Sequence, residues 1–296
     1  MNYKKLGKSE IEVSTIAFGC MSLGNDDAEN KHLLLDAFDQ GINFFDTADI
    51  YAGGQNELTI GKAFKEIRDK VIIATKVGNQ ERPDGNGLDW NPTKKYILEA
   101  VEKSLNRLQT DYIDLYQLHG GTIDDPIDET IEAFEILKQQ GKVRAYGISS
   151  IRPNVIREYV KRSHIDTVMM QFSLLDRRPE ESCLDLLYRN NISVLVRGSL
   201  AQGLLINKPS KNYLNRSEEE VIKASEAIKS LKDRTPQEVA IQFALQPPAI
   251  TSLAIGIRSG NQLKEILQAA DTSALTMKEI IHLQENVQPH YYEQHR

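Results

Sequence analysis

The sequence predicts an α/β protein, specifically a (β/α)8 TIM barrel with an N-terminal β-hairpin and extra C-terminal helices. Short apolar runs alternate eight times with segments of helical apolar spacing along the 296 residues. Alternating strands and helices joined by right-handed crossovers leave few other folds. A barrel of this length is ordinary, so we expect residues 1–296 to form a single domain.

Eight core strands are predicted from short apolar runs that are bounded by glycine or polar turn residues. Residues 3–13 alternate loosely around Gly7-Lys8-Ser9, which favours a small hairpin ahead of the barrel. The core strands are expected at residues 16–18, 42–45, 71–75, 113–118, 143–148, 168–172, 192–196 and 252–255.

Helices are predicted where apolar residues recur three or four positions apart. Thr235 followed by Pro236 shows the typical start signal, an N-cap residue and a proline at the first helical position. Residues 83–87 are expected to form a polar loop, and residues 291–295 a frayed terminus. The helices are expected at residues 29–40, 56–65, from 93 onward, 127–139, 154–162, 180–190, 217–232, 236–245, 261–270 and 276–286.

Composition narrows the class of partner and the compartment. The net charge is −6 and no dense Lys/Arg run occurs, which argues against nucleic acid or a membrane surface as a partner. Cys20 and Cys183 lack CxxC spacing, which favours a reducing compartment over a disulfide framework. The chain begins without an apolar signal segment, and no apolar run is long enough to span a bilayer. We therefore expect a cytoplasmic protein.

Four chemically useful residues lie at or just beyond the ends of three successive predicted strands. Asp46 ends one strand and Tyr51 follows it, Lys76 ends the next strand, and His119 ends the third. In a parallel barrel these strand ends converge on one rim, which holds the active site. We therefore expect the four side chains to share a pocket.

These residue types suit the reduction of a carbonyl group, in which the developing alkoxide needs a proton donor. Tyr51 is the expected general acid, although a free phenol has a pKa of about 10. The Lys76 ammonium is expected to lower that pKa, with Asp46 holding Lys76 charged and aimed. His119 is expected to orient the carbonyl by a hydrogen bond. The alternative is a structural Asp46–Lys76 ion pair with His119 as a core residue.

Three segments carry a resemblance to the aldo-keto reductases, of the bacterial, NADPH-dependent type. They are Gly-Ile-Asn-Phe-Phe-Asp-Thr-Ala-Asp-Ile-Tyr at 41–51, Ala-Thr-Lys at 74–76, and Ser-Leu-Asn-Arg-Leu-Gln-Thr-Asp-Tyr-Ile-Asp-Leu-Tyr-Gln-Leu-His at 104–119. The similarity runs almost end to end. It implies an oxidoreductase that reduces a small aldehyde or ketone to an alcohol with NADPH, working as a monomer or weak homo-oligomer.

The resemblance also implies where NADPH binds, in an extended pose across the barrel mouth. Ser149 and Gln171 match the positions that grip the nicotinamide carboxamide, while Ser150 replaces a usual Asn. Arg197 stands where the family commonly has a stacking aromatic, and residues 198–205 are expected to line the pyrophosphate. The alternative reading of Ser149-Ser150 is a simple helix cap.

A second cofactor segment follows the last core strand. Arg258 and Ser259 at a helix start suit a 2′-phosphate, Gln262 and Glu265 are expected to face adenine and ribose, and Ile266 replaces a usual Asn. The full set of residues expected to bind NADPH/NADP+ is Gly19, Asp46, Ser149, Ser150, Gln171, Arg197, Gly198, Ser199, Leu200, Gln202, Gly203, Gly256, Arg258, Ser259, Gln262 and Glu265.

The substrate pocket is expected to be formed by Met21, Tyr51, Trp90 and His119, although a lone Trp in a loop is as often simple packing. A nicotinamide-binding regulatory subunit with little turnover is the main alternative function, because barrels of this family also serve as accessory subunits.

A metal-dependent hydrolase is a third reading of the same rim. It would use Asp46, Asp49, Glu57 and His119 as ligands. These residues lack a second His and a convincing ligand spacing, so no metal is expected.

Overall fold

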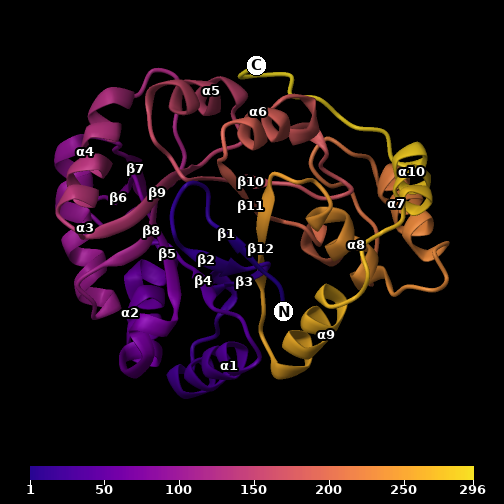
Figure 1. Ribbon diagram of the computed structural model, residues 1–296, viewed down its shortest axis with the longest axis horizontal. Coiled ribbons are helices and arrows are strands. Elements are labelled where there is room, and N and C mark those ends of the chain that lie inside the picture. Colours follow the sequence, from indigo (N-terminus) through magenta and orange to yellow (C-terminus); the bar gives the residue numbers. More distant parts are fainter.

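The computed structural model describes residues 1–296 and contains a closed barrel of eight parallel strands, as predicted. Around the barrel the strands follow the order β10-β11-β12-β3-β4-β5-β8-β9. Figure 1 shows helices surrounding this ring of strands. The barrel strands are β3 (Ile16–Gly19), β4 (Phe44–Asp46), β5 (Ile72–Val77), β8 (Ile113–Leu118), β9 (Val143–Ser149), β10 (Thr167–Gln171), β11 (Ser193–Arg197) and β12 (Ile250–Gly256).

Most connections between barrel strands run through a helix that packs its apolar side against the strands. Between β11 and β12 there are two helices, and a further helix, α10, follows α9 at the end of the chain and packs against α7. The helices are α1 (Asp27–Asp39), α2 (Gln55–Phe64), α3 (Lys94–Leu108), α4 (Ile127–Gln139), α5 (Pro153–Arg162), α6 (Cys183–Arg189), α7 (Glu218–Lys229), α8 (Pro236–Leu245), α9 (Gly260–Ala270) and α10 (Met277–Asn286).

The predicted N-terminal hairpin closes the end of the barrel where the strands begin. It consists of β1 (Tyr3–Lys5) and β2 (Glu12–Ser14), paired antiparallel. Its side chains Leu6, Ile11 and Val13 are buried, and they pack with inward-facing barrel residues. Burial of each such side chain stabilises the fold by about 1.5–3 kcal/mol. The hairpin therefore seals this end, which we call the base.

The structure corrects four details of the predicted elements. The second core strand is shifted toward Asp46, and the third continues through Lys76. Residues 83–87 do form a turn, but it joins two short strands, β6 (Asn79–Glu81) and β7 (Leu88–Trp90). The predicted helix 180–190 is interrupted at Ser182, so α6 is shorter and follows a 3-10 turn.

The C-terminal segment is not frayed, contrary to expectation. Tyr292 is only 6% exposed, and the guanidinium of Arg178 lies 5.0 Å from its ring centroid. Further along, the backbone amide of Asn154 donates to the carbonyl of His295 at 2.9 Å. Figure 1 shows this yellow tail running from α10 past α6 toward α5.

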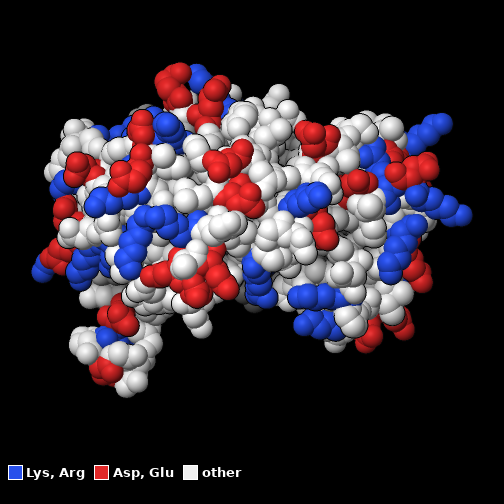
Figure 2. Space-filling view, turned by 90° about the horizontal axis from the view of Figure 1, so that it is seen from below, with Lys and Arg blue, Asp and Glu red and all other residues white.

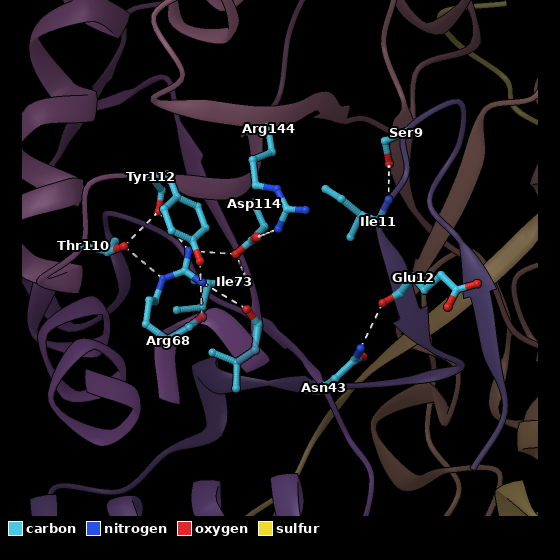
Figure 3. A network of polar contacts seen from close by, with 11 residues as sticks. Ser9, Ile11, Glu12, Asn43, Arg68, Ile73, Thr110, Tyr112, Asp114 and Arg144 are labelled. Carbon is cyan, nitrogen blue, oxygen red and sulfur yellow. Dashed lines mark hydrogen bonds and ion pairs between the residues drawn. The ribbon is translucent and has the colours of Figure 1, made fainter. Parts of the chain in front are cut away.

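A buried ionic network, which we call the base network, ties three strands together near the base. It consists of Asp114, Arg68 and Arg144. Both Asp114 carboxylate oxygens accept from arginine, at 2.7 Å from Arg68 and 2.6 Å from Arg144, and one also accepts from the amide of Ile73 at 3.0 Å. Figure 3 shows Tyr112 beside the two guanidinium groups, the nearer of which lies 4.1 Å from its ring centroid. Because the carboxylate is fully buried, these bonds are needed to offset its desolvation.

The outer surface carries both signs of charge. On the face seen in Figure 2, basic and acidic side chains are interspersed rather than gathered into one field of a single sign. None of the helices combines the length and apolar character that a membrane crossing requires.

Candidate active site

The barrel brings the four predicted catalytic residues to the opposite end from the base, which we call the rim. Asp46 is the last residue of β4, and Lys76 lies in β5 one residue from its end. His119 directly follows β8, and its amide donates to the carbonyl of Val77 on the neighbouring strand at 2.7 Å. Tyr51 begins a 3-10 turn after β4.

Lys76 and Asp46 form a buried ion pair with close to ideal geometry. The Nζ atom lies 2.8 Å from each carboxylate oxygen of Asp46 and 2.6 Å from the carbonyl oxygen of Thr47. The Lys76 side chain is only 1% exposed. All three ammonium donors therefore have an acceptor, and the carbonyl of Thr47 is a contributor that the sequence did not indicate.

The pair shifts the acidity of both groups. Burial raises the pKa of Asp46, and the Lys76 ammonium partly opposes this shift. Burial alone would lower the pKa of Lys76, but the Asp46 carboxylate and the Tyr51 phenol raise it above its ordinary value. The raised pKa of Asp46 favours a neutral carboxyl group, whereas the raised pKa of Lys76 favours a charged ammonium and hence an ion pair. The threefold acceptor geometry supports the ion pair, in which Lys76 keeps its proton at neutral pH.

Tyr51 lies beside this ammonium. The Nζ atom of Lys76 is 5.3 Å from the centroid of the Tyr51 ring. Burial raises the pKa of Tyr51, while Lys76 and Arg197 lower it and Asp46 raises it. The expected effect of lysine on the phenol is thus present, but burial outweighs it, so the expectation of a net lowering is wrong for this structure.

His119 completes the group as a neutral imidazole. Its ring and that of Tyr51 have centroids 6.0 Å apart at an interplanar angle of 79°. Burial, together with the positive charges of Lys76 and Arg197, lowers the pKa of His119 to about 3. Its Nδ1 atom is buried without a hydrogen-bond partner in the chain. A neutral imidazole donates from one nitrogen, so His119 can bind a carbonyl oxygen without carrying charge.

Besides Asp46, five residues predicted to bind the cofactor each end a barrel strand at the rim. Neighbouring strands align Gln171 with Arg197, and Gly256 with Gly19. Because the ends of parallel strands converge, these positions surround the four predicted catalytic residues, which we call the tetrad. The five residues are Gly19 of β3, Ser149 of β9, Gln171 of β10, Arg197 of β11 and Gly256 of β12.

The side chain of Gln171 is bound from both sides. Its Oε1 accepts from Nη1 of Arg197 at 2.6 Å, and its Nε2 donates to the hydroxyl of Tyr213 at 3.3 Å. Tyr213 is buried, although it belongs to an irregular connection without apolar periodicity, and no sequence signal points to it. Next to Ser149, the buried Ser150 accepts from the amide of Arg152. Arg152 itself, and not Ser149 or Ser150, is the N-cap of α5, so the helix-cap alternative is wrong.

The segment after β11 has an unusual backbone. Ala201, Gln202 and Gly203 all have positive φ, at 45°, 59° and 92°. The amides of Ser199 and Leu200 donate to no acceptor in the chain. Free N–H groups in a tightly turned loop suit an anion such as pyrophosphate.

The start of α9 has the features expected of a phosphate-binding terminus. Ser259 is the N-cap and accepts from the amide of Gln262 at 3.3 Å, and the Arg258 side chain is exposed. The Gln262 side chain accepts from the amide of Arg258 at 2.9 Å, so it braces the turn. Glu265 is exposed on the same helix, whereas Ile266 is 3% exposed and belongs to the core.

Met21 and Trp90, two of the residues predicted to form the substrate pocket, differ in burial and in their contacts. Met21 is 72% exposed. The Trp90 indole is half-buried and donates to Asp125 at 2.9 Å. Its ring covers Gly78 and Gly120, where an added Cβ would lie 2.7 Å and 3.3 Å from ring carbons. Glycine beside His119 therefore makes room for the indole.

Two of the three carboxylates of the metal-hydrolase alternative are already bound by cationic side chains, whereas Oδ1 of Asp49 is buried without a partner. Glu57 is fully buried and is bound by Arg107 at 2.6 Å, as Asp46 is bound by Lys76. Among residues 1–296 no group of three or more His, Cys, Asp and Glu side chains is arranged to hold a metal ion.

Comparison with known proteins shows the family of this chain. A model described as "Aldo/keto reductase family" matches residues 15–287. The chain belongs to the aldo/keto reductase family. Aldo/keto reductases are oxidoreductases that act on carbonyl compounds with a nicotinamide cofactor, so the chain is an oxidoreductase of this kind.

Individual aldo/keto reductases resemble the chain over its whole length. The aldo-keto reductase AKR11C1 from Bacillus halodurans, in its holo form, is 50% identical, covers 100% of this chain and 99% of its own, and has a TM-score of 0.96. The uncharacterized oxidoreductase YqkF of Bacillus subtilis is 49% identical, with 100% of both chains covered. An NADH-specific methylglyoxal reductase of Escherichia coli is 34% identical over 71% of this chain and 70% of its own.

Proposed function

We propose that the protein reduces aldehydes or ketones to alcohols with NADPH, and that Tyr51 is the proton donor. The observation that carries the proposal is the Lys76 ammonium, which is buried and bound by Asp46 on one side while Tyr51 lies on another. A cation held at this depth stabilises a tyrosinate as it forms, because its field is weakly screened.

Each side chain of the tetrad then has one task. His119, neutral and with an Nε2 atom that is neither buried nor bonded within the chain, binds the carbonyl oxygen of the substrate and orients it. Tyr51 transfers its proton to that oxygen as negative charge develops there. Lys76 stabilises the phenolate that remains, and Asp46 fixes the position and charge of Lys76. A nicotinamide dinucleotide, when bound at the rim, would supply the hydride.

The rim residues fit a dinucleotide that extends from the tetrad to α9. Gln171 offers an amide for the carboxamide group, and the free amides of Ser199 and Leu200 suit the pyrophosphate. Arg258 beside the N-cap Ser259 suits the additional phosphate of NADPH. The Escherichia coli relative is named for NADH, so this preference is a property to be measured for this chain.

The test of the proposal is NADPH consumption with a panel of small aldehydes, ketones and α-dicarbonyls, using the wild type and Tyr51→Phe. We expect the wild type to turn over and the variant to lose about 10²–10⁴-fold in kcat, because only the proton donor is removed. The dissociation constant of NADPH serves as the control, and its value in the variant should stay within about twofold of the wild-type value. Equal rates in the two proteins would exclude Tyr51 as the acid.

The same measurements decide between an enzyme and a regulatory subunit. Tight NADPH binding without turnover of any carbonyl in the panel would favour the regulatory alternative.

The free, buried Cys20 and Cys183 support a reducing compartment such as the cytoplasm as the place where the protein works.

A further inference from the structure

The turn that carries Tyr51 has a strained backbone. Ala52, Gly53 and Gly54 follow the tyrosine with φ angles of 50°, 60° and 86°. Three consecutive left-handed residues, one of them with a Cβ, are unfavourable for the chain on its own. Such a conformation persists only where neighbouring groups hold it.

Arg107 of α3 is a group that holds this turn from below. A Cβ at Gly54 would lie 2.8 Å from Cδ of Arg107, so the arginine stem occupies the space that the glycine leaves. The guanidinium then binds Glu57, in the first turn of α2, with Nε and Nη2 at 2.7 Å and 2.6 Å from Oε2. Glu57 is fully buried, so this charged pair is weakly screened.

Glu57 connects the turn to the strand that carries Lys76. Its second carboxylate oxygen accepts from the hydroxyl of Thr75 at 2.6 Å, and Thr75 precedes Lys76 in β5. The amide of Asp49 adds a second link by donating to the carbonyl of Lys76 at 3.4 Å. A continuous series of contacts therefore runs from Gly54 through Arg107 and Glu57 to the residue beside Lys76.

We propose that Arg107 is a positioning residue for carbonyl reduction, which fixes the separation between the Tyr51 phenol and the Lys76 ammonium through Gly54 and Glu57. The inference rests on the proposed role of Tyr51 as proton donor. No contact joins Arg107 to the tetrad directly, so it acts through the backbone of the turn and of β5.

The charges around Arg107 agree with this role. Burial raises the pKa of Asp49 to about 7, the Glu57 carboxylate adds to the shift, and Arg107 opposes it. The charges of Asp49 and Glu57 raise the pKa of Tyr116 of β8, and the charge of Asp49 raises the pKa of Tyr96 of α3. Lys76 of β5 is the remaining cation. Without Arg107, two acidic groups below the turn would lose their main counter-charge, and their repulsion would loosen the turn.

The experiment compares Arg107→Met with Arg68→Met, a matched arginine of the base network that also binds a fully buried carboxylate. We expect Arg107→Met to lower kcat about 10- to 100-fold, because small misplacements of catalytic groups have effects of this size, with KM and the NADPH Kd within about twofold. Arg68→Met should leave kcat within about twofold.

The pH profile separates positioning from general loosening. Tyr51 must be protonated to act, so kcat falls as pH rises through its pKa, which burial raises and Lys76 partly lowers. If the phenol lies farther from Lys76 in Arg107→Met, the lowering effect of Lys76 on the Tyr51 pKa is lost. The alkaline limb of the kcat–pH profile of this variant should therefore move to higher pH. Asp46 and Arg197 are the other charges that face Tyr51. Should Arg107→Met fail to fold, Glu57→Gln takes its place with the same expectations.

The outcomes are distinct for the two proposals. An unchanged kcat in the folded variant, an unmoved alkaline limb, or an equal loss in Arg68→Met overturns the positioning role and leaves the proposed function intact. A wild type that reduces no carbonyl, or Tyr51→Phe with wild-type rates, overturns the proposed function itself, and with it the positioning role.

Discussion

The base and the rim of this barrel each contain a buried carboxylate that is bound by cationic side chains, but the polar groups around the two carboxylates differ. At the base, Asp114 has acceptor bonds to Arg68, Arg144 and a backbone amide, as Figure 3 shows. At the rim, the Asp46–Lys76 pair lies beside His119, whose Nε2 atom is neither buried nor bonded within the chain. The comparison separates an arrangement that serves stability from one that keeps polar groups available for a ligand.

The largest contrast is expected from removing the rim cation. Lys76→Met should lower kcat by about 10³-fold or more, because the phenolate loses its stabilising charge. The variant should also lose about 3–5 kcal/mol of unfolding free energy, since Asp46 remains buried without its partner. Steady-state kinetics and denaturant unfolding measure the two effects. A variant with near-wild-type kcat would remove Lys76 from the mechanism.

The matching change at the base should affect stability alone. Asp114→Asn removes the charge that two arginines share, and we expect a loss of about 3 kcal/mol in the free energy of unfolding. Its kcat should stay within about twofold of wild type, because the base network lies at the other end of the strands. A selective loss of kcat would show that the two ends are coupled.

A smaller effect is expected from acid. The folded pKa of His119, at about 3, lies below the unfolded value of about 6.5, so the unfolded state binds the extra proton between these values. The neutral histidine therefore costs stability as pH falls from about 6.5 toward 3. His119→Gln should lose about 1–2 kcal/mol less than wild type between pH 7 and pH 5. Parallel denaturant titrations at both pH values measure this, and identical losses would contradict a buried neutral imidazole.

The smallest expected effect concerns the exposed cation of the rim. Arg197 replaces the expected aromatic and binds Gln171, and its charge should repel the oxidised nicotinamide ring. Arg197→Tyr is expected to strengthen binding of NADP+ relative to NADPH by a few-fold. Dissociation constants of both cofactors, before and after the change, provide the measurement. An unchanged ratio of the two dissociation constants would show that Arg197 has no effect on the retention of NADP+ relative to NADPH.

The sequence predicted the barrel and the residues that gather at its rim, because both follow from local patterns. Apolar runs mark the strands, and parallel strands must bring Asp46, Lys76 and His119 to one end. The hairpin β6–β7 was missed because its residues are largely exposed and lack a buried alternating side. The contact of Tyr213 with Gln171 depends on an irregular loop, and no periodicity encodes such a contact.

The net acidity of Tyr51 was also beyond local patterns. The attraction of Lys76 for the phenolate follows from charge alone, but burial of the ring depends on the packing of the whole rim, and burial has the larger effect. A pattern of residue types can therefore assign partners more readily than it can assign the sign of a net shift.

The hairpin that fills the base gives the barrel only one doorway. With Leu6, Ile11 and Val13 filling the base, a ligand that contacts Tyr51 has to approach from the rim.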